Sequence, residues 1–121
     1  MSASLVPITE RTFEFAVRIV KLCQVIEEQS SVSRPLARQL IRSGTSIGAN
    51  VEESQAAESR ADFIHKMSIA LKEARETRYW LRLLVAAEMI SEERLGALIQ
   101  ESEALMKIIG KIVVSTKRGN S

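Results

Sequence analysis

Several residue types that build active sites and cross-links are nearly missing from this chain of 121 residues. It has one cysteine, Cys23, which excludes an intrachain disulfide and is consistent with a reducing compartment. Its one histidine, His65, has no neighbouring cysteines that would complete a usual zinc site, and no recognisable nucleophile motif accompanies it. We therefore expect no enzyme activity, no metal and no cofactor.

Long apolar runs are missing as well. No run approaches the roughly 20 residues that a membrane-spanning helix needs. The first residues, MSASLVPITER, lack the charged-then-apolar order of a signal peptide. The net charge is only +2, so bulk charge gives a faint indication of an acidic partner and no more. These features predict a cytoplasmic protein that does not bind membranes.

Proline (2) and glycine (5) are scarce and strand-like alternation is absent, which favours an all-α chain. Apolar residues recur at helical spacing in four segments, which predicts helices over about 9–28, 34–57, 60–88 and 92–114. Thr9, Ser33 and Ser91 are the expected N-caps. Because the connections are short, residues 1–121 are predicted to form one domain, an antiparallel up-and-down four-helix bundle.

The segment RSGTSIGANVEESQAA, residues 42–57, has a loop-like composition but keeps a helical register. Gly44 and Gly48 fall on the apolar side of this helix, where a glycine costs roughly 0.5–1 kcal/mol relative to alanine. We expect close approach of another backbone to offset that cost, with Ser43, Ser46 and Asn50 packed beside the glycines. The alternative is that the glycines are tolerated near a kink. A phosphate-binding loop is disfavoured because GTSIGAN lacks the required Gly-Lys-Ser/Thr ending.

Two of the predicted helices carry more apolar surface than one bundle helix needs to bury. The surplus residues are Phe13, Val17 and Val20, which widen the core face of the first helix, and Ile69, Trp80 and Leu83, which lie roughly opposite the core face of the third. Such surplus indicates a partner, and self-association is the simplest interpretation. The alternative is a tail or loop that covers Trp80, which the short and polar tails disfavour. We predict that these six residues form an oligomer interface.

Basic residues are concentrated in rows on the second and third helices. The rows are Arg34, Arg38 and Arg42, and Lys72, Arg75, Arg78 and Arg82. Arginine rows can neutralise the phosphate backbone of RNA or DNA, so these seven residues form the candidate nucleic-acid-binding site. The alternatives are pairing between subunits with Glu52, Glu53, Glu58, Glu73 and Glu76, and plain solvation. Glu76 lies four residues after Lys72, which favours these alternatives in part.

Two stretches together resemble a known family. RSGTSIGANVEE, residues 42–53, looks like the signature segment of the four-helix-bundle proteins encoded in intervening sequences of bacterial 23S ribosomal RNA genes. ESRADFIHKMSIALKEARETRYWLRLL, residues 58–84, resembles the third helix of that family. The resemblance extends from Phe15 to Val113. It implies a bundle that assembles into a homo-oligomeric ring, typically a pentamer, with no established catalytic residues.

Proteins similar in fold include the accessory proteins of diversity-generating retroelements, which form basic pentameric barrels associated with nucleic acid and a reverse transcriptase. The modest net charge of this chain departs from those relatives. The leading hypothesis is therefore a non-enzymatic bundle protein, pentameric as the resemblance implies, that binds RNA or DNA through its basic rows. The alternative is a ring-shaped scaffold for another protein, with no nucleic-acid ligand.

Overall fold

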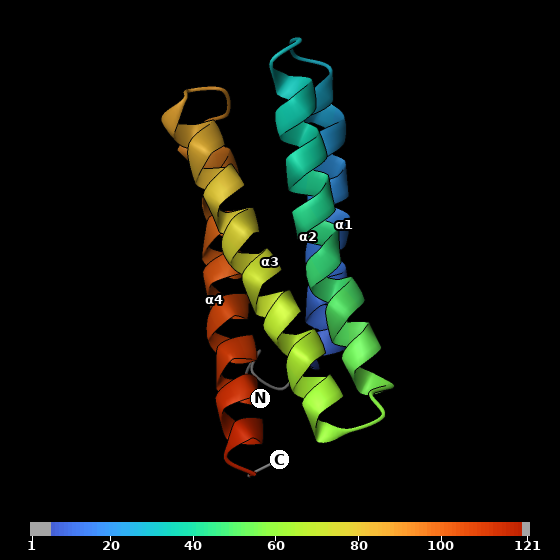
Figure 1. Cartoon of the computed structure of the whole chain (residues 1–121). Helices are drawn as coiled ribbons and strands as arrows, with labels where there is room; N and C mark the ends of the chain where they lie inside the picture. Colours follow the sequence, from blue (N-terminus) through green and yellow to red (C-terminus); the bar gives the residue numbers. More distant parts are fainter. Residues whose placement is uncertain (1–5, 120–121) are drawn as a thin grey trace.

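A computed structural model describes residues 6–119, and within that range it contains four α-helices and no strand. The helices are α1 (Ile8–Glu27), α2 (Ser33–Gln55), α3 (Arg60–Ala86) and α4 (Glu92–Lys117). Successive helices run in opposite directions and are joined by short turns (Figure 1). The all-α prediction is confirmed, and the largest difference is that α4 continues to Lys117 instead of ending near residue 114.

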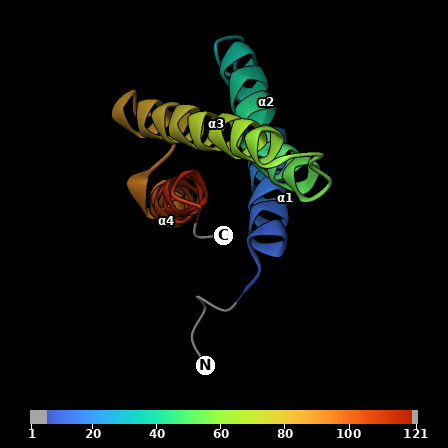
Figure 2. The same cartoon turned by 60° about the horizontal axis from the view of Figure 1, so that its bottom comes forward.

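The helices pack in chain order, so that α1 contacts α2, α2 contacts α3, and α3 contacts α4. α1 and α4 have few contacts, and α3 lies across the molecule on the side away from α1 (Figure 2). The main link across the weakly packed side is an ion pair, in which Arg11 donates to both carboxylate oxygens of Glu101 at 2.6 and 2.9 Å. The fold is an up-and-down bundle in which the α1–α4 side is the loosest.

One apolar stripe on each helix forms the core, as the 3.6-residue period predicts. Five residues that share one face of α1 at helical spacing are all buried, namely Phe15, Ile19, Leu22, Cys23 and Ile26. Three apolar residues of α3, Phe63, Leu71 and Val85, are only partly buried, because they pack at the edge of the core. Every buried side-chain nitrogen or oxygen within residues 6–119 has a hydrogen-bond partner.

The glycine-containing segment is part of α2, and the glycines lie against α1. A Cβ atom added at Gly44 would lie 2.7 Å from Cγ2 of Ile19, and one added at Gly48 would lie 3.2 Å from the backbone oxygen of Thr12. Both distances are shorter than ordinary van der Waals contacts, so a side chain at either position would displace α1. The glycines therefore set the distance between α1 and α2.

The small polar residues of this segment have different contacts. The hydroxyl of Ser43 is buried and accepts a hydrogen bond from Thr77 of α3 at 3.0 Å. Ser46 donates to the backbone oxygen of Arg42 at 2.5 Å, and Asn50 donates to that of Ser46 at 2.8 Å. Ser43 thus joins two helices, whereas Ser46 and Asn50 bond to their own helix.

The helix starts confirm one predicted cap and correct two. Ser91 caps α4, because its hydroxyl accepts from the backbone N–H of Arg94. Thr9 lies inside α1, whose cap position is Pro7 and has no side-chain hydrogen bond. Ser33 lies in the first turn of α2 rather than before it, and its own N–H donates to Oγ of Ser30 at 3.2 Å.

Among the described helices, none combines the length and apolar character needed to cross a bilayer.

Candidate nucleic-acid interface

The seven basic residues predicted from the sequence lie in separate places on the structure. Arg34 and Arg38 are exposed on the first turns of α2. At this end α2 and α3 diverge in both views of the molecule (Figures 1 and 2). The two predicted rows therefore do not merge into one continuous surface.

Arg42 lies where α2 and α3 are in contact, and it is paired. Its guanidinium donates to Glu73 at 3.3 Å and also to Glu76. The indole N–H of Trp80 donates to the same Glu76 oxygen at 2.9 Å. The hydrogen bond from Trp80 and the guanidinium of Arg42 lower the pKa of the Glu76 carboxyl, which keeps this side chain ionised. Arg42 is thus paired with glutamates of its own subunit, whereas the sequence-based alternative was pairing between subunits.

Three of the predicted residues share one side of α3 and form no salt bridge with the described residues. Lys72, Arg75 and Arg82 are exposed, and none forms a salt bridge within residues 6–119. Their spacing of three and seven residues places them on one helix face. We call this surface the α3 basic face.

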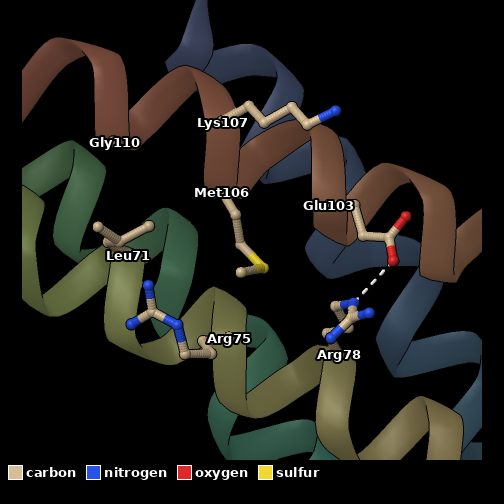
Figure 3. Close-up of a pocket in the computed structure, with 7 residues that line it drawn as sticks. All are labelled: Leu71, Arg75, Arg78, Glu103, Met106, Lys107 and Gly110. Atoms are coloured by element: carbon tan, nitrogen blue, oxygen red, sulfur yellow. Dashed lines mark hydrogen bonds and ion pairs between the residues drawn. The ribbon is translucent and has the colours of Figure 1, made fainter.

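Arg78 points instead toward α4, where it donates to Glu103 at 2.7 Å (Figure 3). This ion pair lies between two adjoining grooves of about 490 and 390 Å³, which share Arg78 and Glu103 in their linings. The first groove is lined by Leu71, Arg75, Arg78, Glu103, Met106, Lys107 and Gly110. Because Gly110 and Gly96 carry no side chain, α4 leaves room along this side of α3.

The predicted interface residues of α1 do not widen its core face, and this is a correction. Phe13 is 65% exposed and Val17 is 38% exposed, and both line a groove of about 390 Å³ on the outside of α1 with Ala16 and Val20. The reason is the rotation of α1 about its axis, which turns Phe15 and Ile19 toward the core. We call Phe13, Ala16, Val17 and Val20 the α1 apolar stripe.

The predicted interface residues of α3 are partly covered by their own chain. Ile69, Trp80 and Leu83 are all half-buried, and Trp80 packs against the hydrophobic core. Its indole is further held by the hydrogen bond to Glu76. These residues offer less free apolar surface than the α1 apolar stripe does.

One exposed aromatic residue was not singled out by the sequence analysis. Tyr79 lies on α3 between Arg75 and Arg82 and is 55% exposed. Its ring meets that of Trp80 edge to face, with centroids 5.1 Å apart and an interplanar angle of 76°. The sequence signal was present, because an aromatic residue four positions after one arginine and three before another shares their helix face.

Comparison with known protein families identifies the family of this chain. Residues 6–111 match the family described as 23S rRNA-intervening sequence protein. The chain belongs to the 23S rRNA-intervening sequence protein family. A similar solved structure is that of a protein of unknown function from the S23 ribosomal protein family of Bacteroides thetaiotaomicron. It is 43% identical, with a TM-score of 0.83, over 88% of this chain and 98% of that one. No curated protein matches.

The single cysteine and the single histidine of this 23S rRNA-intervening sequence family member lie on different helices, α1 and α3. Cys23 is buried, and burial raises the pKa of its thiol to about 11, with a smaller effect from Glu27. His65 is exposed on α3. Within residues 6–119 no three His, Cys, Asp or Glu side chains are grouped so that they could hold a metal ion.

Proposed function

We propose that the protein assembles into a homo-oligomeric ring, with five subunits as the family resemblance implies, and that the ring binds RNA or DNA through the α3 basic face. The observation that carries this proposal is the absence of carboxylate partners for Lys72, Arg75 and Arg82 within the described residues. Unpaired exposed cations are available to phosphates, whereas Arg42 and Arg78 would first have to leave their glutamates.

Ring assembly is supported by the α1 apolar stripe. An exposed phenylalanine beside exposed and half-exposed valines is costly in water, and a second subunit can cover it. Assembly also matters for binding, because three cations on one subunit contact few phosphates. Repetition of the α3 basic face around a ring would raise the overall affinity through multivalency without any new contact.

An electrophoretic mobility-shift assay at low salt tests the proposal. The protein is first confirmed to be oligomeric by light scattering and is then titrated into labelled RNA and DNA. We expect binding that weakens steeply as salt is added, because bound cations displace counterions from the phosphates. A double variant, Arg75→Gln with Arg82→Gln, should bind more weakly than the wild type. No binding by oligomeric protein at low salt would sink the proposal.

A scaffold for another protein is the alternative, and the grooves between α3 and α4 favour it. Their linings include the partly buried apolar residues Leu71, Val85, Ile99 and Met106, which are suited to an amphipathic helix. A partner retained on the immobilised protein after nuclease treatment, and released by the substitution Gly110→Gln in the groove, would favour this function. Loss of the partner on nuclease treatment would favour nucleic-acid binding.

We further propose that the protein is not an enzyme. The buried thiol of Cys23, whose pKa is raised to about 11, and the exposed position of His65 on α3 support this view. We also propose that the protein is located in the cytoplasm.

A further inference from the structure

Tyr79 is an exposed aromatic ring in the middle of a basic helix face. Arg75 precedes it by four residues and Arg82 follows it by three, so all three side chains lie on the same side of α3. The tyrosine is 55% exposed, although a large aromatic side chain favours burial. Proteins that bind single-stranded nucleic acids combine exposed aromatic rings, on which bases stack, with basic side chains that contact the phosphates. Tyr79, between two arginines that form no salt bridge, has this arrangement.

We infer that Tyr79 stacks against a base and makes the α3 basic face select single-stranded over double-stranded nucleic acid. The inference rests on the proposed function and specifies its ligand. In a duplex the bases are paired and stacked on one another, so a surface tyrosine can reach only the backbone. In a single strand a base is free to lie against the ring while the flanking phosphates contact Arg75 and Arg82.

The neighbours of Tyr79 hold its ring in place without covering it. The edge-to-face contact with Trp80 can cover only one of the two faces of the tyrosine ring. Trp80 is itself fixed, because its indole N–H donates to Glu76 and Glu76 is paired with Arg42. A ring that is already ordered loses less conformational freedom on binding than a free one, which favours stacking.

The cluster of Arg42, Glu73 and Glu76 thereby acquires a second role. Through Glu76 it holds the indole of Trp80 by a hydrogen bond, and the Trp80 ring in turn contacts that of Tyr79 edge to face. Arg42 is then a positioning residue rather than a phosphate contact, although the sequence grouped it with the nucleic-acid-binding arginines.

The test compares single-stranded and duplex ligands of one sequence, each as RNA and as DNA, by fluorescence anisotropy. The proteins are the wild type, Tyr79→Ala, Tyr79→Phe and Arg75→Gln. We expect Tyr79→Ala to bind single strands about ten-fold more weakly, which is within the range expected for the loss of one stacked base, and to leave duplex binding within two-fold. Tyr79→Phe keeps the ring and should bind like the wild type. Arg75→Gln should weaken both ligands, because phosphates are common to both.

Trp80 provides an independent readout, because it is the only tryptophan and its ring lies 5.1 Å from that of Tyr79. Single-stranded ligand should change its fluorescence in the wild type and much less in Tyr79→Ala. Equal loss of single-strand and duplex binding in Tyr79→Ala, or no loss in either, would overturn the inference while the proposed function stands.

The oligomer mass of Tyr79→Ala, measured by light scattering, completes the test. A smaller mass than that of the wild type would assign Tyr79 to a subunit contact and contradict stacking. An unchanged mass with selective loss of single-strand binding supports it. If the wild type binds no nucleic acid at all, the proposed function fails first and this inference fails with it.

Discussion

At the scale of single residues, burial determines the chemistry of Cys23. The thiol lies in the core and donates to the backbone oxygen of Ala37, with sulfur and oxygen 3.5 Å apart. Burial raises its pKa to about 11, so the reactive thiolate is almost absent near neutral pH. A single cysteine could have been a nucleophile, and its surroundings make it a small core residue instead.

We predict that Cys23 of the folded protein reacts very slowly with a thiol reagent at pH 8 and quickly once urea unfolds the chain. The reagent releases a chromophore when it reacts with a thiol, and the absorbance of this chromophore measures the rate of labelling. A variant that combines Cys23→Ala with Ser31→Cys is the control, because Ser31 is exposed between α1 and α2 and its replacement should react at once. Equally fast labelling of Cys23 in the folded wild type would show that α1 and α2 open readily.

Glu76 should make the stability of the protein depend on pH. Its pKa is lowered from the ordinary value, first by the hydrogen bond from Trp80 and also by Arg42. The contribution to stability is therefore fully present above the ordinary pKa of about 4.5 and is lost as the pH falls through the lowered value.

Glu76→Gln should lower the free energy of unfolding at pH 7 by up to about 1 kcal/mol, as expected for a partly exposed ion pair. The difference from the wild type should shrink at pH 3, below the ordinary pKa, because the unfolded chain then binds a proton that the folded carboxylate resists. Urea unfolding at the two pH values measures both quantities. Glu52→Gln is the control, since Glu52 is exposed and outside every ion pair of the described residues, and it should show neither effect.

At the scale of helices, the contact between α1 and α2 depends on Gly44 and Gly48. The place that an alanine methyl would take at Gly44 is occupied by the branched side chain of Ile19, whose Cγ2 and Cγ1 atoms would lie 2.7 and 2.9 Å away. Those atoms are close to the α1 backbone and have little freedom to move.

Gly44→Ala should therefore destabilise the protein by about 1–3 kcal/mol despite the better helix propensity of alanine. Gly96→Ala is the matched control, because Gly96 also lies inside a helix and no atom would come within 4 Å of its Cβ. It should stabilise by about 0.5–1 kcal/mol through propensity alone. Thermal unfolding followed by circular dichroism measures both changes, and a melting temperature for Gly44→Ala at or above that of the wild type would contradict close packing.

The helices and their core faces were predictable from the sequence because helical periodicity and burial follow from local spacing. Phe15, Ile19 and Ile26 recur at spacings that no strand or loop would keep, and they are buried. Pairing between helices was not predictable in this way. In the sequence, Arg42 and Arg78 could not be distinguished from the other arginines of their rows. In the structure they form ion pairs with Glu76 and Glu103 of other helices. Their pairing depends on how the helices are rotated and offset, which no short segment of sequence contains.

At the scale of the whole molecule, the α1 apolar stripe and the α3 basic face lie on helices that do not contact each other. α1 packs mainly on α2, whereas α3 packs on α2 and α4. One surface can therefore be covered by a neighbouring subunit while the other stays open to a ligand. The two proposed properties, assembly and nucleic-acid binding, are compatible in one molecule for this reason.

Assembly through α1 predicts that the double variant Phe13→Glu with Val17→Glu has a smaller mass than the wild type in light scattering. Two carboxylates in the middle of an apolar contact would be buried without partners, which is strongly unfavourable. Val32→Glu is the control, because Val32 is 62% exposed in the turn before α2 and lies outside the stripe. An unchanged mass in the double variant would remove the α1 apolar stripe from the interface.

The salt dependence of binding tests the central claim most directly. The affinity of the oligomer for a single-stranded ligand is measured over a range of salt concentrations for the wild type, Arg75→Gln and Arg94→Gln, the last removing an equal charge from the first turn of α4. Each phosphate contact contributes about 0.7 to the slope of log affinity against log salt for single strands. We predict a shallower slope for Arg75→Gln and an unchanged slope for Arg94→Gln. Equal slopes for all three proteins, or no binding by the wild type at the lowest salt, would contradict a nucleic-acid-binding role for the α3 basic face.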